Sequence, residues 1–277
     1  MNQTEFPLLQ VDAFTDKPFG GNPAAVCLLG EMRDDAWLQA VAAEMNLAET
    51  AFLVAEGDRF HLRWFTPKLE VPLCGHATLA SAHALWEAGT VSDDRSAIHF
   101  RSASGELVAH RGEDGFIELD FPALSTTPIA LSDAVSTMLV GDPAPQVEYS
   151  AVVSGKSGPE TLLVQLASED QVRRLTPALH GLRYPGGPGV IVTARAGSDE
   201  FDFVSRFFFP SAGIDEDPAT GSAHCALTPF WSERLGKTEM TAYQASPRGA
   251  VIGVRLDGDR VRLCGRAVTV LRGTLIA

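Results

Sequence analysis

The sequence lacks any run of eighteen or more consecutive apolar residues, the minimum for a membrane-spanning helix. Its first ten residues contain neither a basic cluster nor a long apolar stretch, so we expect no signal peptide. The four cysteines lie far apart and form no C-x-x-C pair, which argues against a disulfide framework and a structural zinc site; they are Cys27, Cys74, Cys225 and Cys264. These absences predict a cytoplasmic protein.

Basic residues are also scarce. There are 22 Lys and Arg against 35 Asp and Glu, which leaves a net charge of −13. Such a field repels nucleic acid and anionic membranes, so neither is an expected partner. No nucleotide-binding glycine motif is present, and we predict no cofactor and no metal. An anionic substrate would therefore need positive potential gathered locally.

Short runs rich in β-branched and aromatic residues dominate the chain and predict strands. They cover residues 8–14, 24–29, 50–54, 60–65, 98–101, 116–121, 161–166, 190–193, 201–209, 251–256 and 262–271. Apolar spacing predicts three helices, at residues 35–45, 76–88 and 222–235. A cluster of Pro and Ser at residues 122–128 predicts a boundary between domains at residues 1–125 and 126–277. The last strand of the second domain can pack back on the first domain in this division.

A repeated pattern links the two predicted domains. The segment Arg63–Pro67 (RWFTP) corresponds to Arg206–Pro210 (RFFFP). Each is followed, eight and eleven residues later, by a glycine that opens a helix of small residues: Gly75 and Gly221. Matching order and spacing indicate that the chain consists of two diverged copies of one half.

Each of these glycines precedes the start of a predicted helix. A helix N-terminus offers free backbone N–H groups and the positive end of the helix dipole, equivalent to roughly half a charge. Two such ends could hold a carboxylate without any lysine, which meets the constraint set by the net charge. The alternative is that both glycines only permit tight turns between strand and helix.

Candidate catalytic residues lie on or near these turns. His76 is in the first turn of its helix, where the dipole disfavours imidazolium and should keep the ring neutral. Glu49 lies in a mostly apolar stretch, where burial would raise its pKa, as a proton-shuttling carboxyl requires. Asp217, rigidified by Pro218, is the acid of its turn most suited to point inward. The alternatives are a structural histidine, a surface glutamate and an acid that only complements the helix dipole.

Cys74 immediately precedes Gly75, and a thiol at a helix N-terminus can be acidified. Its counterpart in the second copy is Thr220 rather than a second cysteine. A symmetric two-thiol racemisation is therefore not available in its usual form.

Taken together, these segments resemble the PhzF-like family, named for the isomerase of phenazine biosynthesis and related in fold to diaminopimelate epimerase. The matching stretches are Val11–Phe14 (VDAF), Gly21–Ala24 (GNPA), Asn46–Thr50 (NLAET), Phe65–Pro67 (FTP), Cys74–Thr78 (CGHAT), Glu216–Ser222 (EDPATGS) and Arg272–Leu275 (RGTL). Three positions depart from the phenazine-type pattern: Cys74 stands where alanine is more common, Ala77 where proline is more common, and Ala48 where many members have serine.

The resemblance implies an α/β (α+β) fold of two similar domains, each a curled, mostly antiparallel sheet around a central helix, with the site in the cleft between them. It also implies cofactor-free acid–base chemistry and a homodimer. Carried over by motif, the catalytic residues would be Glu49, His76 and Asp217. The residues that bind a small carboxylate substrate would be Asn22, Cys74, Gly75, Thr220, Gly221 and Ser222.

Two other functions compete with this cofactor-independent isomerase. One is an amino-acid racemase or epimerase that uses Cys74 with a non-thiol partner. The other is a non-catalytic protein that binds small molecules on the same duplicated scaffold. A protein that only binds small molecules need not keep Glu49, His76 and Asp217 together. This sequence has all three, which favours an enzyme.

Overall fold

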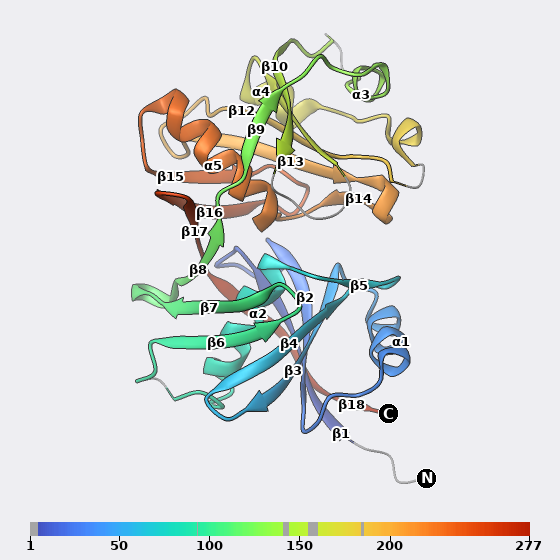
Figure 1. The fold of residues 1–277 in the computed structure, drawn as a ribbon, viewed down its shortest axis with the longest axis vertical. Coiled ribbons are helices and arrows are strands. Elements are labelled where there is room, and N and C mark those ends of the chain that lie inside the picture. Colours follow the sequence, from blue (N-terminus) through green and yellow to red (C-terminus); the bar gives the residue numbers. More distant parts are fainter. Residues whose placement is uncertain (1–4, 93, 141–143, 155–159, 184–185) are drawn as a thin grey trace. The chain divides into compact units, whose positions relative to one another are not determined.

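The computed structural model describes residues 5–92, 94–140, 144–154, 160–183 and 186–277. The chain divides into two compact units, Met1–Phe121 with Leu263–Ala277 and Pro122–Arg262 (Figure 1). Among the described residues, no helix combines the length and the apolar character that a membrane crossing needs.

The first unit is a sheet built around one buried helix. Its strands pair in the order β18–β1–β2–β3–β4–β6–β7–β8, antiparallel except for β2/β3 and β4/β6. The elements are β1 (Glu5–Ala13), β2 (Asn22–Leu29), α1 (Asp35–Met45), β3 (Glu49–Glu56), β4 (Arg59–Phe65), β5 (Glu70–Val71), α2 (Gly75–Glu87), β6 (Ala97–Ser102), β7 (Gly105–Arg111), η1 (Glu113–Gly115), β8 (Ile117–Pro122) and β18 (Ala267–Ile276).

The second unit repeats this arrangement. Its strands pair in the order β9–β10–β11–β12–β13–β15–β16, antiparallel except for β11/β12 and β13/β15. The elements are β9 (Ser125–Pro128), α3 (Asp133–Met138), β10 (Val147–Ser154), β11 (Thr161–Leu166), α4 (Glu169–Arg174), η2 (Leu179–Leu182), β12 (Gly189–Arg195), β13 (Phe203–Phe209), η3 (Pro210–Ala212), β14 (Ile214–Asp217), α5 (Gly221–Leu235), β15 (Glu239–Gln244), β16 (Ala250–Asp257) and β17 (Arg260–Gly265).

The same sequence of parallel and antiparallel pairings occurs in both units, with β4 equivalent to β13 and α2 equivalent to α5. This confirms the predicted α/β fold of two similar domains. The central helices are buried on nearly all sides because small residues such as Ala77, Ala80, Ala223 and Ala226 let the strands approach closely. Wide burial of this kind distinguishes them from α1, which buries only the face formed by Leu38, Val41 and Ala42.

The outermost strands are exchanged between the two halves of the sequence. Because β4 is equivalent to β13, the two copies of the repeat are β1–β9 and β10–β18, and β9 ends the first copy yet pairs with β10 of the second. β18 follows the last strand of the second half and pairs with β1, from Glu5 opposite Ile276 to Ala13 opposite Ala267 (Figure 1). Each sheet is therefore finished by a strand from the other half of the sequence.

The predicted strand at 262–271 is wrong in one respect, because the structure divides it between β17 and β18. Arg266 lies at the break, and its carbonyl accepts a hydrogen bond of 3.1 Å from the backbone N–H of Thr15. The chain leaves one strand pairing and enters another at this point. A run of alternating residues cannot show where such a change of partner occurs.

The repeat places two arginines at equivalent positions in different environments. Arg206 on β13 is 8% exposed, and its guanidinium donates to both carboxylate oxygens of Glu216 and to the carbonyls of Val172 and Leu175. Arg63 on β4 makes a similar fork with Glu70, but the Glu70 side chain is 35% exposed. The first ion pair is buried and the second is partly solvated.

Replacing each arginine by leucine should therefore give unequal losses of stability. Arg206→Leu leaves the mostly buried Glu216 carboxylate and two carbonyls without their donor, so we expect the free energy of unfolding to fall by about 3 kcal/mol. Arg63→Leu removes a partly solvated pair and should cost about 1 kcal/mol or less. Urea titration of both variants measures the difference, and equal losses would contradict the assignment of a buried pair.

Candidate active site

Three buried polar side chains meet at the start of α2 in the first unit. Glu49 is the first residue of β3 and lies beside Ala24 of β2. Cys74 is the N-cap residue of α2, and His76 is the second residue of that helix. All three are less than 10% exposed. The structure thus brings Glu49 next to two side chains that lie 25 and 27 positions later in the sequence.

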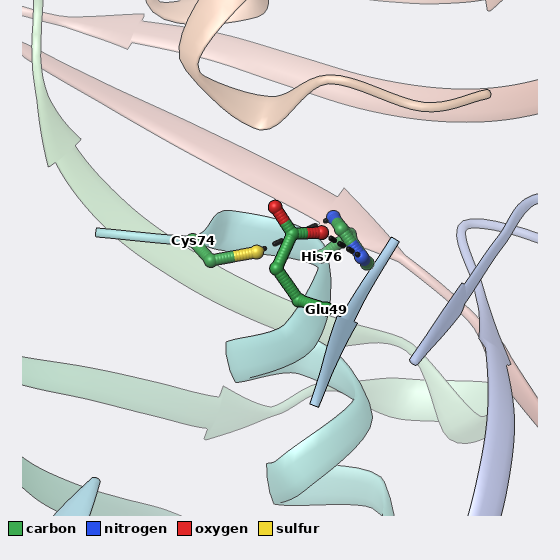
Figure 2. Close-up of side chains that lie close together, drawn as sticks. All are labelled: Glu49, Cys74 and His76. Atoms are coloured by element: carbon green, nitrogen blue, oxygen red, sulfur yellow. Dashed lines mark hydrogen bonds and ion pairs between the residues drawn. The ribbon is translucent and has the colours of Figure 1, made fainter. Parts of the chain in front are cut away.

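The imidazole of His76 contacts both of the other side chains (Figure 2). Its Nε2 is 3.2 Å from Oε2 of Glu49, an electrostatic contact rather than an aligned hydrogen bond. Its Nδ1 is 3.4 Å from Sγ of Cys74. The side-chain nitrogen of Asn22, the first residue of β2, also lies 3.2 Å from Nδ1.

His76 is neutral at physiological pH. Burial lowers the pKa of its imidazole to about 3, because the charged form loses its hydration. The neutral ring still has one N–H donor and one bare nitrogen, so it can pass or orient a proton without adding charge to the site.

The cluster also has donor atoms that metals use. Within the described residues, one oxygen, one sulfur and one nitrogen of Glu49, Cys74 and His76 lie within 4.8 Å of one another. However, Cys74 approaches Nδ1 whereas Glu49 approaches Nε2. A single ion cannot bind through both contacts to the ring, so this arrangement is better suited to proton transfer than to coordination.

The two central helices begin with backbone N–H groups that precede the first hydrogen bond of the helix. In α2 the first such bond runs from the N–H of Thr78 to the carbonyl of Cys74. In α5 it runs from the N–H of His224 to the carbonyl of Thr220. Gly75, Gly221 and Ser222 lie ahead of these bonds, as the first or second residues of their helices. Both helix starts therefore present the positive end of a dipole.

The second unit holds its own polar cluster at the start of α5. Asp215 is exposed and pairs with Arg183, and Glu216 pairs with Arg206, whereas Asp217 is 9% exposed. The hydroxyl of Thr220 donates to Oδ2 of Asp217 over 2.5 Å. Of the three acids in this turn, Asp217 is the buried one.

Gln244, at the end of β15, holds this turn in place and was missed by sequence reasoning. Its side-chain oxygen accepts from the N–H of Thr220 at 2.8 Å, and its nitrogen donates to the carbonyl of Asp217 at 2.6 Å. The same nitrogen lies 3.1 Å from the Thr220 hydroxyl oxygen. Gln244 is fully buried at the last position of β15, where alternate side chains point into the protein. This alternation is the only signal in the sequence that could have indicated a buried role for Gln244.

The fold and these clusters define a class of protein: a duplicated, epimerase-like α/β fold with buried ionisable side chains near the N-termini of its central helices. The chain shares this fold with the crystal structure of a hydroxyproline epimerase from Agrobacterium vitis, with a TM-score of 0.62 at 13% identity over 98% of this chain and 92% of that one. At this identity the likeness concerns the fold alone.

Within this class, the chain belongs to the family of phenazine biosynthesis-like proteins, whose family model matches residues 11–273. It is 47% identical to an uncharacterized isomerase from Halalkalibacterium halodurans over 98% of both chains. It is also similar to the crystal structure of a PhzF-family phenazine biosynthesis protein from Enterococcus faecalis. The TM-score is 0.88 at 38% identity, and the match covers 98% of this chain and 99% of that one.

Proposed function

We propose that the protein is a cofactor-independent isomerase that moves a proton on a small, carboxylate-bearing metabolite. The observation that carries this proposal is the buried carboxylate of Glu49, 3.2 Å from the neutral imidazole of His76. A carboxylate next to a neutral hydrogen-bonding ring is a general base that can also return the proton it has taken. The isomerase names of close relatives support the same reaction class.

In the proposed reaction, the Glu49 carboxylate removes a proton from a carbon of the substrate, and the electron pair of the broken C–H bond shifts into the neighbouring π system. The carboxylic acid exchanges its proton with solvent while the intermediate is bound and then protonates a different carbon, which restores the Glu49 carboxylate. His76 and Asp217 assist by hydrogen bonding. The N–H groups at Gly75, Gly221 and Ser222 bind substrate oxygen atoms and stabilise the negative charge of the intermediate.

The family also supports a homodimer that acts in the cytoplasm on a small anion. Its substrate carboxylate would be bound by the helix dipoles rather than by lysine. This is consistent with the net charge of −13, because the positive potential is local and comes from the backbone.

Solvent-deuterium incorporation tests the reaction class directly. We expect the protein in heavy water to convert a matching carboxylate substrate, with deuterium appearing at the carbon that gains the proton. Mass spectrometry locates the label in a panel of unsaturated and α-substituted carboxylic acids. A product that has been oxidised or hydrolysed would contradict an isomerase.

Epimerisation through Cys74 is a second candidate function, because its sulfur is buried and lies 3.4 Å from His76. The two functions differ in what Cys74→Ala does. If Glu49 moves the proton, we expect the variant to keep more than about a tenth of the exchange rate, since removing the transferring group itself costs about 10²–10⁴-fold. Complete loss of exchange in a folded variant would favour the epimerase.

A further inference from the structure

The position of the proton on His76 follows from the groups around its ring. The side-chain nitrogen of Asn22 lies 3.2 Å from Nδ1, and an amide nitrogen can only donate. Nδ1 must then be the bare nitrogen that accepts. The sulfur of Cys74 lies 3.4 Å from the same atom, and its thiol is compatible with a bare Nδ1 because it can donate a weak hydrogen bond. The proton of the neutral ring therefore lies on Nε2.

The opposite side of the ring leads to the same tautomer. Nε2 faces Oε2 of Glu49 at 3.2 Å, and a carboxylate oxygen can only accept. A proton on Nε2 brings positive charge next to the carboxylate and gives attraction at this contact, whereas a bare Nε2 would bring a second negative atom near it and give repulsion. The contacts at Nδ1 and at Nε2 thus agree on one tautomer.

Asn22 is held rigidly enough to impose this choice. It is fully buried, pairs with Ala13 across the sheet, and follows Gly21, whose φ is 57°. A Cβ atom at Gly21 would lie 2.0 Å from the carbonyl oxygen of Ala13, so the turn admits no other residue without moving. The turn therefore fixes the backbone from which the Asn22 amide reaches His76.

We propose that Asn22 is a positioning residue that sets the tautomer of His76, so that an N–H rather than a lone pair faces Glu49. The resemblance implied that Asn22 binds substrate; the geometry points to His76 as its partner. The consequence for catalysis rests on the proposed function, in which Glu49 moves the proton. The tautomer itself does not depend on that function.

Replacing Asn22 by aspartate tests the proposal, because a carboxylate accepts where the amide donates. In the whole protein labelled with ¹⁵N-histidine, His76 of the native chain should show the Nε2–H pattern of imidazole nitrogen shifts, assigned by comparison with His76→Gln. Asn22→Asp should change it to Nδ1–H and lower the exchange rate at least about 10²-fold; a wrong imidazole tautomer costs up to about 10⁴-fold in serine proteases.

Two further variants separate positioning from a general structural role. Asn22→Ala removes the donor without adding an acceptor, so His76 should keep its Nε2 proton and the loss should be smaller than with aspartate. Asn46→Asp makes the same substitution at an exposed helix end and should change neither readout. Equal losses for alanine and aspartate, with the tautomer unchanged, would show that Asn22 only supports the fold.

The native protein alone can overturn the proposal, even if Asn22→Asp does not fold. An Nδ1–H pattern for His76 in the unaltered chain would be incompatible with Asn22 acting as donor. Failure of the proposed function gives a different result: exchange would persist in Glu49→Gln while the tautomer of His76 still responded to Asn22→Asp.

Discussion

Glu49→Gln should lower the rate of solvent-deuterium exchange by about 10²–10⁴-fold, the usual contribution of a group that transfers the proton. Glutamine keeps the volume and hydrogen-bonding capacity of the side chain but cannot take up a proton. The loss should appear in the rate of the chemical step rather than in substrate affinity, because the amide still fills the position beside His76. Exchange measured by NMR at saturating substrate reports that step.

Glu44→Gln provides the matched control for this experiment. Glu44 lies on α1, five residues before Glu49, and is exposed. The same chemical change there should leave exchange and stability as they are. Undiminished exchange in a folded Glu49→Gln variant would contradict the assignment of Glu49 as the acid–base group.

A steep loss of stability in mild acid is the second large effect we expect. Burial lowers the pKa of His76 to about 3 and that of His224 to about 4, whereas both rings titrate near 6.5 in the unfolded chain. Below pH 6.5 the unfolded chain therefore binds protons that the native protein does not. The free energy of unfolding falls as the pH is lowered, by at most about 1.4 kcal/mol per pH unit for each histidine.

His224→Gln isolates half of this effect. From pH 7 to pH 5 the native protein should lose at most about 2 kcal/mol more than the variant, since one fewer ring is protonated on unfolding. Urea titrations at each pH measure the slopes, and parallel curves for the native protein and His224→Gln would contradict the argument.

Much of the fold could be predicted because its signals are local. The spacing of Trp37, Leu38, Val41 and Met45 predicted α1 with the observed bounds, 35–45, and the two central helices were predicted to within one residue at each end. Several strands were missed, among them β7, β10 and β15. Their residues, such as Gly105–Arg111, mix charged and apolar side chains, and they are stabilised by neighbouring strands rather than by their own pattern.

The sequence could predict which residues form the candidate site, but it could not predict which of their atoms are in contact. Motif spacing selected Glu49, Cys74 and His76, and the structure places them together. The role of Asn22 and the clamp formed by Gln244 depend on which side-chain atom faces which partner. That information comes from strand pairing across long sequence separations, which one sequence does not show.

The exchange of outer strands has a consequence for how the protein is made. β1 leaves the ribosome before its neighbour β18, and every other strand described here is synthesised between them. Until then one edge of β1 has no strand to pair with, and such an edge invites aggregation. β9 and β10 are close neighbours in the chain, so the second unit can assemble most of its sheet earlier. The half that is synthesised first is the half that is completed last.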